Sequence, residues 1–90
     1  MENYNRVEKG AWETRYYLND KLHRLDGPAI ESCYGYKEWY QNGLPHRTDG
    51  PAYEYCNGNK INKQWYYEGK FITDKSQEEF ERLIKLKLFW

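Results

Sequence analysis

A segment of 23 residues occurs twice in this 90-residue chain, and this duplication limits the folds that the chain can adopt. With a shift of 23, residues 16–35 match residues 39–58, and both copies contain the run His-Arg-x-Asp-Gly-Pro-Ala. A third, partial copy begins at Trp65 with a shift of 26, which places three added residues in segment 57–63. Repeated units bury their apolar faces by stacking on one another, so the sequence predicts a row of similar units.

Each copy has the residue pattern of β-strands. Short segments rich in Tyr and Trp are bounded by Gly, Pro, Asn or Asp, which is typical of strands. Dipeptides that favour the positive φ angles of a two-residue hairpin turn stand at matching places: Asn19-Asp20, Asn42-Gly43 and Glu68-Gly69. The Asp-Gly-Pro runs add a second reversal in each unit. The predicted strands are 12–18, 29–34, 37–41, 52–56 and 64–67, paired antiparallel in one sheet of about five or six strands.

The C-terminal part has a helical pattern instead. Ser76 and Glu79 fit a reciprocal capping box at the start of a helix. Apolar residues then recur on one helical stripe, at Phe80, Leu83, Ile84 and Leu88. The predicted fold class is therefore mainly β (β+α), with residues 1–90 as a single domain. An antiparallel β-meander of repeated hairpins covers about residues 4–73, and one C-terminal α-helix covers about residues 76–88.

Composition narrows the class of partner and the compartment. Fourteen basic residues balance 14 acidic ones, which argues against a protein that binds nucleic acid mainly through phosphates. An aromatic content of 19% argues against disorder. The sequence has no apolar run of the ~20 residues that span a bilayer and no signal peptide. We therefore expect no membrane contact and a cytoplasmic location.

Residues 39–52 read Trp-Tyr-Gln-Asn-Gly-Leu-Pro-His-Arg-Thr-Asp-Gly-Pro-Ala. This run resembles the small WYxNGxxHRxDGPA repeat proteins of large tailed phages and giant viruses, which are similar to variants of MORN repeats. The resemblance covers about residues 12–75, and the first copy departs from the motif at Tyr16 and Asp20. It implies β-hairpin repeats and a viral origin, and it offers no catalytic motif. MORN-like repeats are associated with protein or membrane-surface contacts, an analogy at the level of the fold.

The repeated His, Arg and Asp could form an acid–base or phosphate site. Because the trio recurs at the same phase beside a turn, a structural role is favoured. We predict that Arg24 with Asp26, and Arg47 with Asp49, brace their turns. The two sets are expected to lie apart and not around one shared pocket. No catalytic residue is assigned, and the chain is predicted not to be an enzyme.

The histidines and cysteines lack the spacing of a metal site, since each His stands ten residues before a Cys. We therefore predict no metal and no cofactor. Cys33 and Cys56 are expected on equivalent strands with one strand between them, ~9.5 Å apart. A disulfide requires less than about 7 Å between Cα atoms. Both cysteines are predicted to be reduced and half-buried.

Most aromatic rings are expected to pack, because they are the main large apolar groups available to a strand-rich core. The rings assigned to packing are Trp12, Tyr17, Trp39, Tyr40, Trp65 and Tyr66. In a different interpretation these rings stack single-stranded bases beside Lys60, Lys63 and Lys70. The zero net charge argues against that interpretation.

Residues that differ between the copies are the candidates for recognition. On the strand after each Asp-Gly-Pro, one face is the same in both copies and the other face changes. Tyr34, Tyr53 and Tyr55 belong to the changing face and are the candidate partner-binding residues, together with the C-terminal Trp90. The other possibility is that the C-terminal helix covers this face and buries these tyrosines.

The sequence thus predicts a small non-enzymatic viral accessory protein that binds a host protein in the cytoplasm of the infected cell. Inhibition of a host antiviral defence is the most specific form of this prediction. The alternative function is nucleic-acid or nucleotide binding through aromatic residues on the open sheet face. A homodimer is also expected, because unpaired edge strands and an apolar C-terminal end are common dimer seams.

Overall fold

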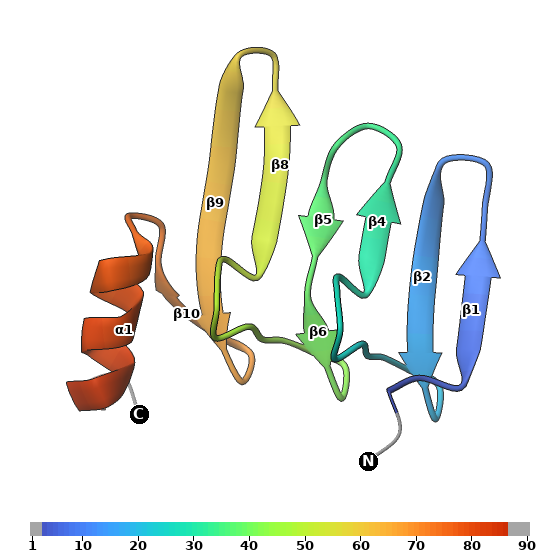
Figure 1. Ribbon diagram of the computed structural model, residues 1–90, viewed down its shortest axis with the longest axis horizontal. Coiled ribbons are helices and arrows are strands. Elements are labelled where there is room, and N and C mark those ends of the chain that lie inside the picture. Colours follow the sequence, from blue (N-terminus) through green and yellow to red (C-terminus); the bar gives the residue numbers. More distant parts are fainter. Residues whose placement is uncertain (1–2, 87–90) are drawn as a thin grey trace.

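Long hairpins stand side by side in one antiparallel sheet, followed by a single helix (Figure 1). The structure is a computed structural model that describes residues 3–86, with the side chain of Asn57 left aside. The long hairpins join β1 (Arg6–Lys9) to β2 (Glu13–Leu18), β4 (Ile30–Ser32) to β5 (Lys37–Glu38), and β8 (Tyr53–Asn57) to β9 (Lys60–Tyr67). The predicted fold class, a mainly β meander of hairpins with one C-terminal helix, is confirmed.

Short hairpins form the opposite end of the sheet. They join β2 to β3 (Lys21–Leu22), β6 (Tyr40–Gln41) to β7 (Leu44–Pro45), and β9 to β10 (Lys70–Thr73). Their turns begin at Asn19, Asn42 and Glu68, with φ angles of 52°, 54° and 48°. The next residue in each turn also has a positive φ, as a two-residue hairpin of this type requires. The predicted turns are therefore confirmed.

The number of strands differs from the prediction. Within residues 3–86 the main sheet has eight strands, and β6 and β7 form a separate two-stranded sheet. The predicted strand 37–41 divides at Trp39, whose N–H donates to the Ala52 carbonyl oxygen at 2.7 Å while its own carbonyl oxygen accepts from the His46 N–H at 3.0 Å. The chain thus passes from the large sheet into the small hairpin at Trp39, and the prediction of one sheet of five or six strands is wrong.

The helix α1 (Gln77–Leu86) lies beside β10 and contacts β9 and β10 (Figure 1). Ser76 caps it, since the Ser76 Oγ accepts the Glu79 N–H at 3.1 Å. Phe80 is fully buried, as its place on the predicted stripe requires. Leu86 lies off the stripe and is exposed. The predicted end of the helix at about residue 88 lies outside the described residues.

The described part of the molecule is thin, with extents of 38 × 37 × 16 Å. Its buried apolar residues are Ala29, Ile30, Ala52, Trp65 and Phe80. Ala29 and Ala52 are the equivalent residues that follow each Pro, and both are completely buried. A core of this size provides little apolar burial, so contacts between polar groups carry more of the stability than in a thicker domain. No helix within residues 3–86 has the length and apolar character needed to cross a membrane.

Candidate functional site

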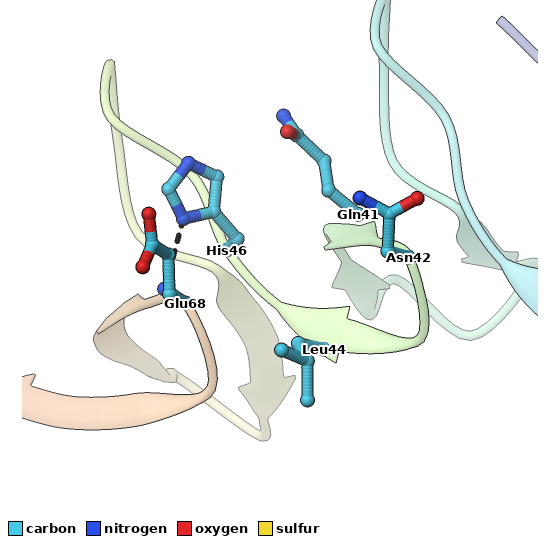
Figure 2. A pocket seen from close by; sticks show the side chains of 5 residues that line it. All are labelled: Gln41, Asn42, Leu44, His46 and Glu68. Atoms are coloured by element: carbon cyan, nitrogen blue, oxygen red, sulfur yellow. Dashed lines mark hydrogen bonds between the residues drawn. The ribbon is translucent and has the colours of Figure 1, made fainter.

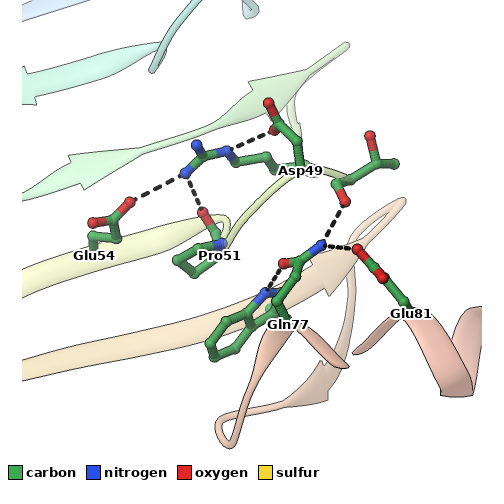
Figure 3. Close-up of polar contacts among 8 residues, drawn as sticks. Asp49, Pro51, Glu54, Gln77 and Glu81 are labelled. Atoms are coloured by element: carbon green, nitrogen blue, oxygen red, sulfur yellow. Dashed lines mark hydrogen bonds and ion pairs between the residues drawn. The ribbon is translucent and has the colours of Figure 1, made fainter. Parts of the chain in front are cut away.

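The Arg47 guanidinium connects three parts of its own repeat unit (Figure 3). Its Nε donates to Asp49 Oδ1 at 2.9 Å, and its Nη1 donates to the Pro51 carbonyl oxygen and to Glu54 Oε2, both at 3.1 Å. The guanidinium carbon lies 3.8 Å from the centre of the Trp39 ring. These charge-assisted bonds fasten the Asp-Gly-Pro turn to the strand that follows it.

Arg24 repeats this arrangement in the preceding unit. It donates to Asp26 Oδ1 at 2.9 Å, to the Pro28 carbonyl oxygen at 3.2 Å and to Glu31 Oε1 at 2.9 Å. It also covers the Tyr16 ring at 4.0 Å. The structure therefore brings together each predicted Arg–Asp pair. The carboxylate on the next strand completes each brace, and it could have been found from the sequence, because it is identical in both copies.

The glycine in each turn makes room for the arginine. A Cβ atom at Gly50 would lie 2.6 Å from Arg47 Cζ, and one at Gly27 would lie 2.9 Å from Arg24 Cζ. Both distances are shorter than a Cβ contact allows. The Asp-Gly-Pro glycine is thus needed for the close approach of the guanidinium to the backbone.

Each histidine connects its own unit to the turn of the next one. His46 Nδ1 accepts the Glu68 N–H at 2.9 Å (Figure 2), and His23 Nδ1 accepts the Asn42 N–H at 2.9 Å. Backbone bonds run alongside, from the Gly43 N–H to the Leu22 carbonyl oxygen at 2.8 Å. Neighbouring units are therefore held together by their turns as well as by strand pairing.

Asn5 does for the first unit what the histidines do for the later ones. Its Oδ1 accepts the Asn19 N–H at 3.1 Å, at the turn equivalent to Asn42. Asn Oδ1 and His Nδ1 are both bonded to Cγ, so the two side chains place an acceptor at the same distance from the backbone. Asn5 thus closes the start of the row with an acceptor that does not titrate.

Gln77 closes the other end. Trp65 occupies the position of Trp39 in the third unit, where its indole N–H donates to Gln77 Oε1 at 2.6 Å. Gln77 Nε2 donates back to the Thr48 carbonyl oxygen at 2.9 Å and to Glu81 (Figure 3). The first residue of α1 therefore connects the aromatic ring of the third unit to the turn of the second.

The histidine environments argue against acid–base chemistry. Burial lowers the pKa of both His23 and His46 below the ordinary value of 6.5, although the Glu68 carboxylate acts in the opposite direction on His46. Both rings accept at Nδ1, which assigns the proton of the neutral ring to Nε2. The Nε2 of His23 is buried with no hydrogen-bond partner among the described residues. Both ring nitrogens of His23 and the Nδ1 of His46 are therefore bonded to the scaffold or buried.

The Arg–Asp pairs of both repeated sets line one shared groove, together with His46 but not the buried His23. The prediction that the sets would lie apart is therefore wrong for the Arg–Asp pairs. Adjacent units stack directly, since the Arg24 N–H donates to the Tyr40 carbonyl oxygen at 3.1 Å, and this brings neighbouring turns side by side. The groove has a volume of about 450 Å³, and its lining includes Arg24, Asp26, Trp39, His46, Arg47 and Asp49. Each arginine there already faces two carboxylates, so the groove has no positive charge to spare for a phosphate.

A smaller hollow of about 240 Å³ lies beside His46 (Figure 2). Its walls are Gln41, Asn42, Leu44, His46 and Glu68. It contains no serine, cysteine or lysine that could act as a nucleophile. Across the described residues, no group of three His, Cys, Asp or Glu side chains could hold a metal ion.

Both cysteines are free thiols, and both are exposed. The predicted half-burial is therefore wrong. The strand β4 ends at Ser32, so Cys33 already lies in the turn at the hairpin tip.

Two aromatic rings are exposed at neighbouring hairpin tips. Trp12 precedes β2 and is 63% exposed, and Tyr34 follows β4 and is 64% exposed. Their rings stack with centroids 5.9 Å apart and planes inclined by 27°. The Cys33 N–H donates to the Trp12 carbonyl oxygen at 2.9 Å and holds the two tips together. We call Trp12 and Tyr34 the tip pair.

The exposure of Trp12 differs from its prediction as a packing ring. That assignment is wrong, because the predicted strand 12–18 begins only at Glu13 and leaves Trp12 in the preceding turn. The adjacent Gly10 could have indicated a turn at this point. A hollow of about 280 Å³ adjoins Trp12, and the charged residues in its lining are Glu13 and Glu31.

Tyr53 belongs to the scaffold. Its ring lies between those of Tyr40 and Tyr66, at centroid distances of 6.1 and 4.9 Å, and its hydroxyl is 3.1 Å from the Tyr40 hydroxyl. Burial, together with the hydrogen bonds of the Tyr40 hydroxyl to Tyr53 and Glu38, raises the pKa of Tyr40. Tyr55 is 37% exposed on β8. The predicted tyrosines therefore do not form one patch, because Tyr34 lies in a turn and Tyr53 is packed.

The helix does not cover the face of Tyr53 and Tyr55. Tyr53 pairs with Gln64 across β8 and β9, so the two share one face of the sheet. The next residue, Trp65, points to the other face and bonds to Gln77 of α1. The alternative that α1 buries these tyrosines is therefore wrong. Trp90, the remaining predicted contact, lies outside the described residues.

Comparisons of the chain with family models, with curated proteins and with solved structures find no match. The candidate site is therefore defined by geometry, exposure and charge. Those properties separate an end of the sheet where His and Arg serve the fold from an end where the tip pair faces solvent.

Proposed function

We propose that the chain is a non-enzymatic binding module that recognises a protein partner through the tip pair. The observation that supports this most strongly is the exposure of Trp12 and Tyr34 in a stacked arrangement, 63% and 64% respectively. Tryptophan and tyrosine give a large contact area with few rotatable bonds, and they are enriched among the residues that dominate binding energy. The hydrogen bond between the tips orders both rings before a partner arrives.

Binding is favoured over acid–base or anion chemistry because the repeated histidines and arginines are already engaged. His23 and His46 accept backbone N–H groups, and Arg24 and Arg47 each bond two carboxylates. A general base or an anion clamp would have to give up these bonds to act.

A protein partner is favoured over nucleic acid because of the charge beside the tip pair. Glu13 and Glu31 line the adjoining hollow and pair with Arg15 and Arg24, and no basic side chain lines the hollow to attract a phosphate. The two exposed rings suit an apolar or aromatic side chain of a protein partner. With the viral origin that the resemblance implies, the partner would be a host protein, and blocking a host defence would be the consequence of binding.

Site-specific photo-crosslinking tests this proposal. A photoreactive phenylalanine at position 34 is expected to form an adduct with a protein in nuclease-treated host extract. The control position is 61, because Ile61 is equally exposed, at 61%, on β9 away from the tip pair. The adduct at position 34 should be lost in Trp12→Ala. Equal labelling from positions 34 and 61, or an adduct that nuclease removes, would contradict a protein partner at the tip pair.

A salt titration tests the alternative ligand. The tryptophan fluorescence should not respond to a single-stranded oligonucleotide at low salt. A response that weakens steeply as salt rises would indicate phosphate contacts and would favour nucleic-acid binding over the proposal.

A further inference from the structure

The strand β1 is an open edge of the sheet. It pairs with β2 on one side, and no helix or strand of residues 3–86 lies on its other side, whereas α1 lies beside β10 at the opposite edge (Figure 1). All four residues of β1 are exposed. An open edge presents backbone N–H and C=O groups that can pair with another strand.

The residues of β1 that point their backbone groups outward can be identified. The Gly10 N–H donates to the Glu13 carbonyl oxygen at 2.8 Å, so Gly10 faces β2. Because hydrogen-bonded and non-bonded pairs alternate along an antiparallel ladder, Glu8 and Arg6 also face β2, and Lys9 and Val7 face away. Tyr16, the partner of Val7, supports this assignment. Its N–H points away from β1 and donates to the Ala29 carbonyl oxygen, so Tyr16 and Val7 form a pair without hydrogen bonds between them.

The sequence of β1 is complementary to itself when read in the antiparallel direction. With Val7 opposite Val7 of a second copy, Arg6 of each copy stands opposite Glu8 of the other. Arg6 and Glu8 share one face of the sheet, where the Arg6 Nε lies 3.6 Å from Glu8 Oε2 within one chain while its Nη1 bonds Asp20 at 2.7 Å. A slip of two residues would place Glu8 opposite Glu8, and a slip of four would place Lys9 opposite Lys9, so charge favours the register centred on Val7.

We propose that two copies of the chain pair antiparallel through β1, with the two Val7 residues on the two-fold axis. The Val7 residues exchange backbone N–H···O bonds, their 37% exposed side chains meet on one face, and two Arg6–Glu8 pairs form on the other. The two sheets then continue into one. The contact is isologous, as a two-fold dimer requires, and it leaves both tip pairs free at opposite ends.

Charge reversal tests the β1–β1 interface directly. Arg6→Glu alone and Glu8→Arg alone each place like charges opposite one another, so neither variant should dimerise. An equal mixture of the two variants restores both pairs and should form a heterodimer. Sedimentation equilibrium at about 1 mM suits a contact this small, and the expected mass is twice the 11.0 kDa of one chain for the native protein and for the mixture.

A proline substitution provides a second test. Val7→Pro removes an N–H that points outward, so it should abolish the dimer without breaking a bond to β2, whereas the control Val7→Thr keeps the N–H and should dimerise. A native chain that stays at 11.0 kDa at this concentration would overturn the proposal. So would a dimer that both charge reversals leave intact. Trp12→Ala should leave the dimer mass unchanged, which separates this interface from the tip pair.

Discussion

The two ends of the hairpins differ in how closely the repeat units agree. At the bracing end, which holds the short hairpins, Arg24 and Arg47 make the same contacts in both complete units, and the histidine acceptors connect each unit to the next. At the tip end, the turns after β1, β4 and β8 differ in sequence, and the tip pair is exposed there. The comparison teaches that contacts between units fix one end and leave the other free to vary.

Removing a brace should have the largest effect on stability. Arg47→Ala loses charge-assisted bonds to Asp49, Pro51 and Glu54 and uncovers Trp39, so it should lower the free energy of unfolding by about 2–4 kcal/mol. Urea denaturation measures this loss. The control Arg82→Ala removes an exposed arginine of α1 and should cost less than about 0.5 kcal/mol. Equal losses of unfolding free energy in the two variants would contradict a stabilising role of the Arg47 contacts beyond that of an exposed arginine.

Removing an acceptor between units should have an intermediate effect. His46→Ala leaves the Glu68 N–H without its bond and should lower the free energy of unfolding by about 1–2 kcal/mol. His46→Asn keeps an acceptor on Cγ, as Asn5 does in the first unit, and should lose less than half as much in the same thermal or urea assay. If His46→Asn loses as much unfolding free energy as His46→Ala, the hydrogen-bond acceptor is not the source of the stabilisation by His46.

Mild acid should weaken the bracing end by a smaller amount. Burial lowers the pKa of His23 and His46 in the folded state below 6.5, so the unfolded chain binds protons first as the pH falls. The stabilisation from the neutral rings is therefore complete above about pH 6.5 and is lost as the pH falls through the folded-state pKa values. Unfolding curves between pH 7 and pH 5 measure the loss. In the double variant His23→Asn, His46→Asn the free energy of unfolding should not change between pH 7 and pH 5. A pH dependence equal to that of the native protein would assign the effect to carboxylates.

Truncation at the tip end should have the smallest effect on stability. Trp12→Ala and Tyr34→Ala remove rings that are mostly exposed, so each should change the free energy of unfolding by less than about 0.5 kcal/mol. Trp12→Ala should also lose the photo-crosslink from position 34 that tests the proposed function. A loss of stability as large as that of Arg47→Ala would mean that the tips serve the fold and would remove the contrast between the two ends.

Local signals in the sequence were enough to predict the turns and the class of fold. Asn42-Gly43 predicts a hairpin because both residues tolerate positive φ, and Ser76 marks the start of α1 by capping it. The Arg–Asp pairs could be predicted for the same reason, since their members are two residues apart. Such features depend on neighbours along the chain, which a sequence displays directly.

Contacts between units could not be predicted in the same way. His46 and Glu68 are 22 residues apart, and their bond depends on how one unit sits beside the next. The shared groove follows from the same stacking. Trp12 was misassigned because an aromatic ring near a strand end packs or remains exposed according to where the strand begins, and a shift of one residue decides between the two.

The histidine that each unit offers to its successor gives the row a polarity. In an inserted 23-residue module, the histidine would accept a turn N–H of the following unit, and the turn of the module would donate to the histidine of the preceding unit. Neither neighbour would need to change. At the two ends of the described row the contacts come from Asn5 and Gln77 instead. The number of modules between these two contacts sets the breadth of the described row, so gain or loss of whole modules would change its width by one unit at a time.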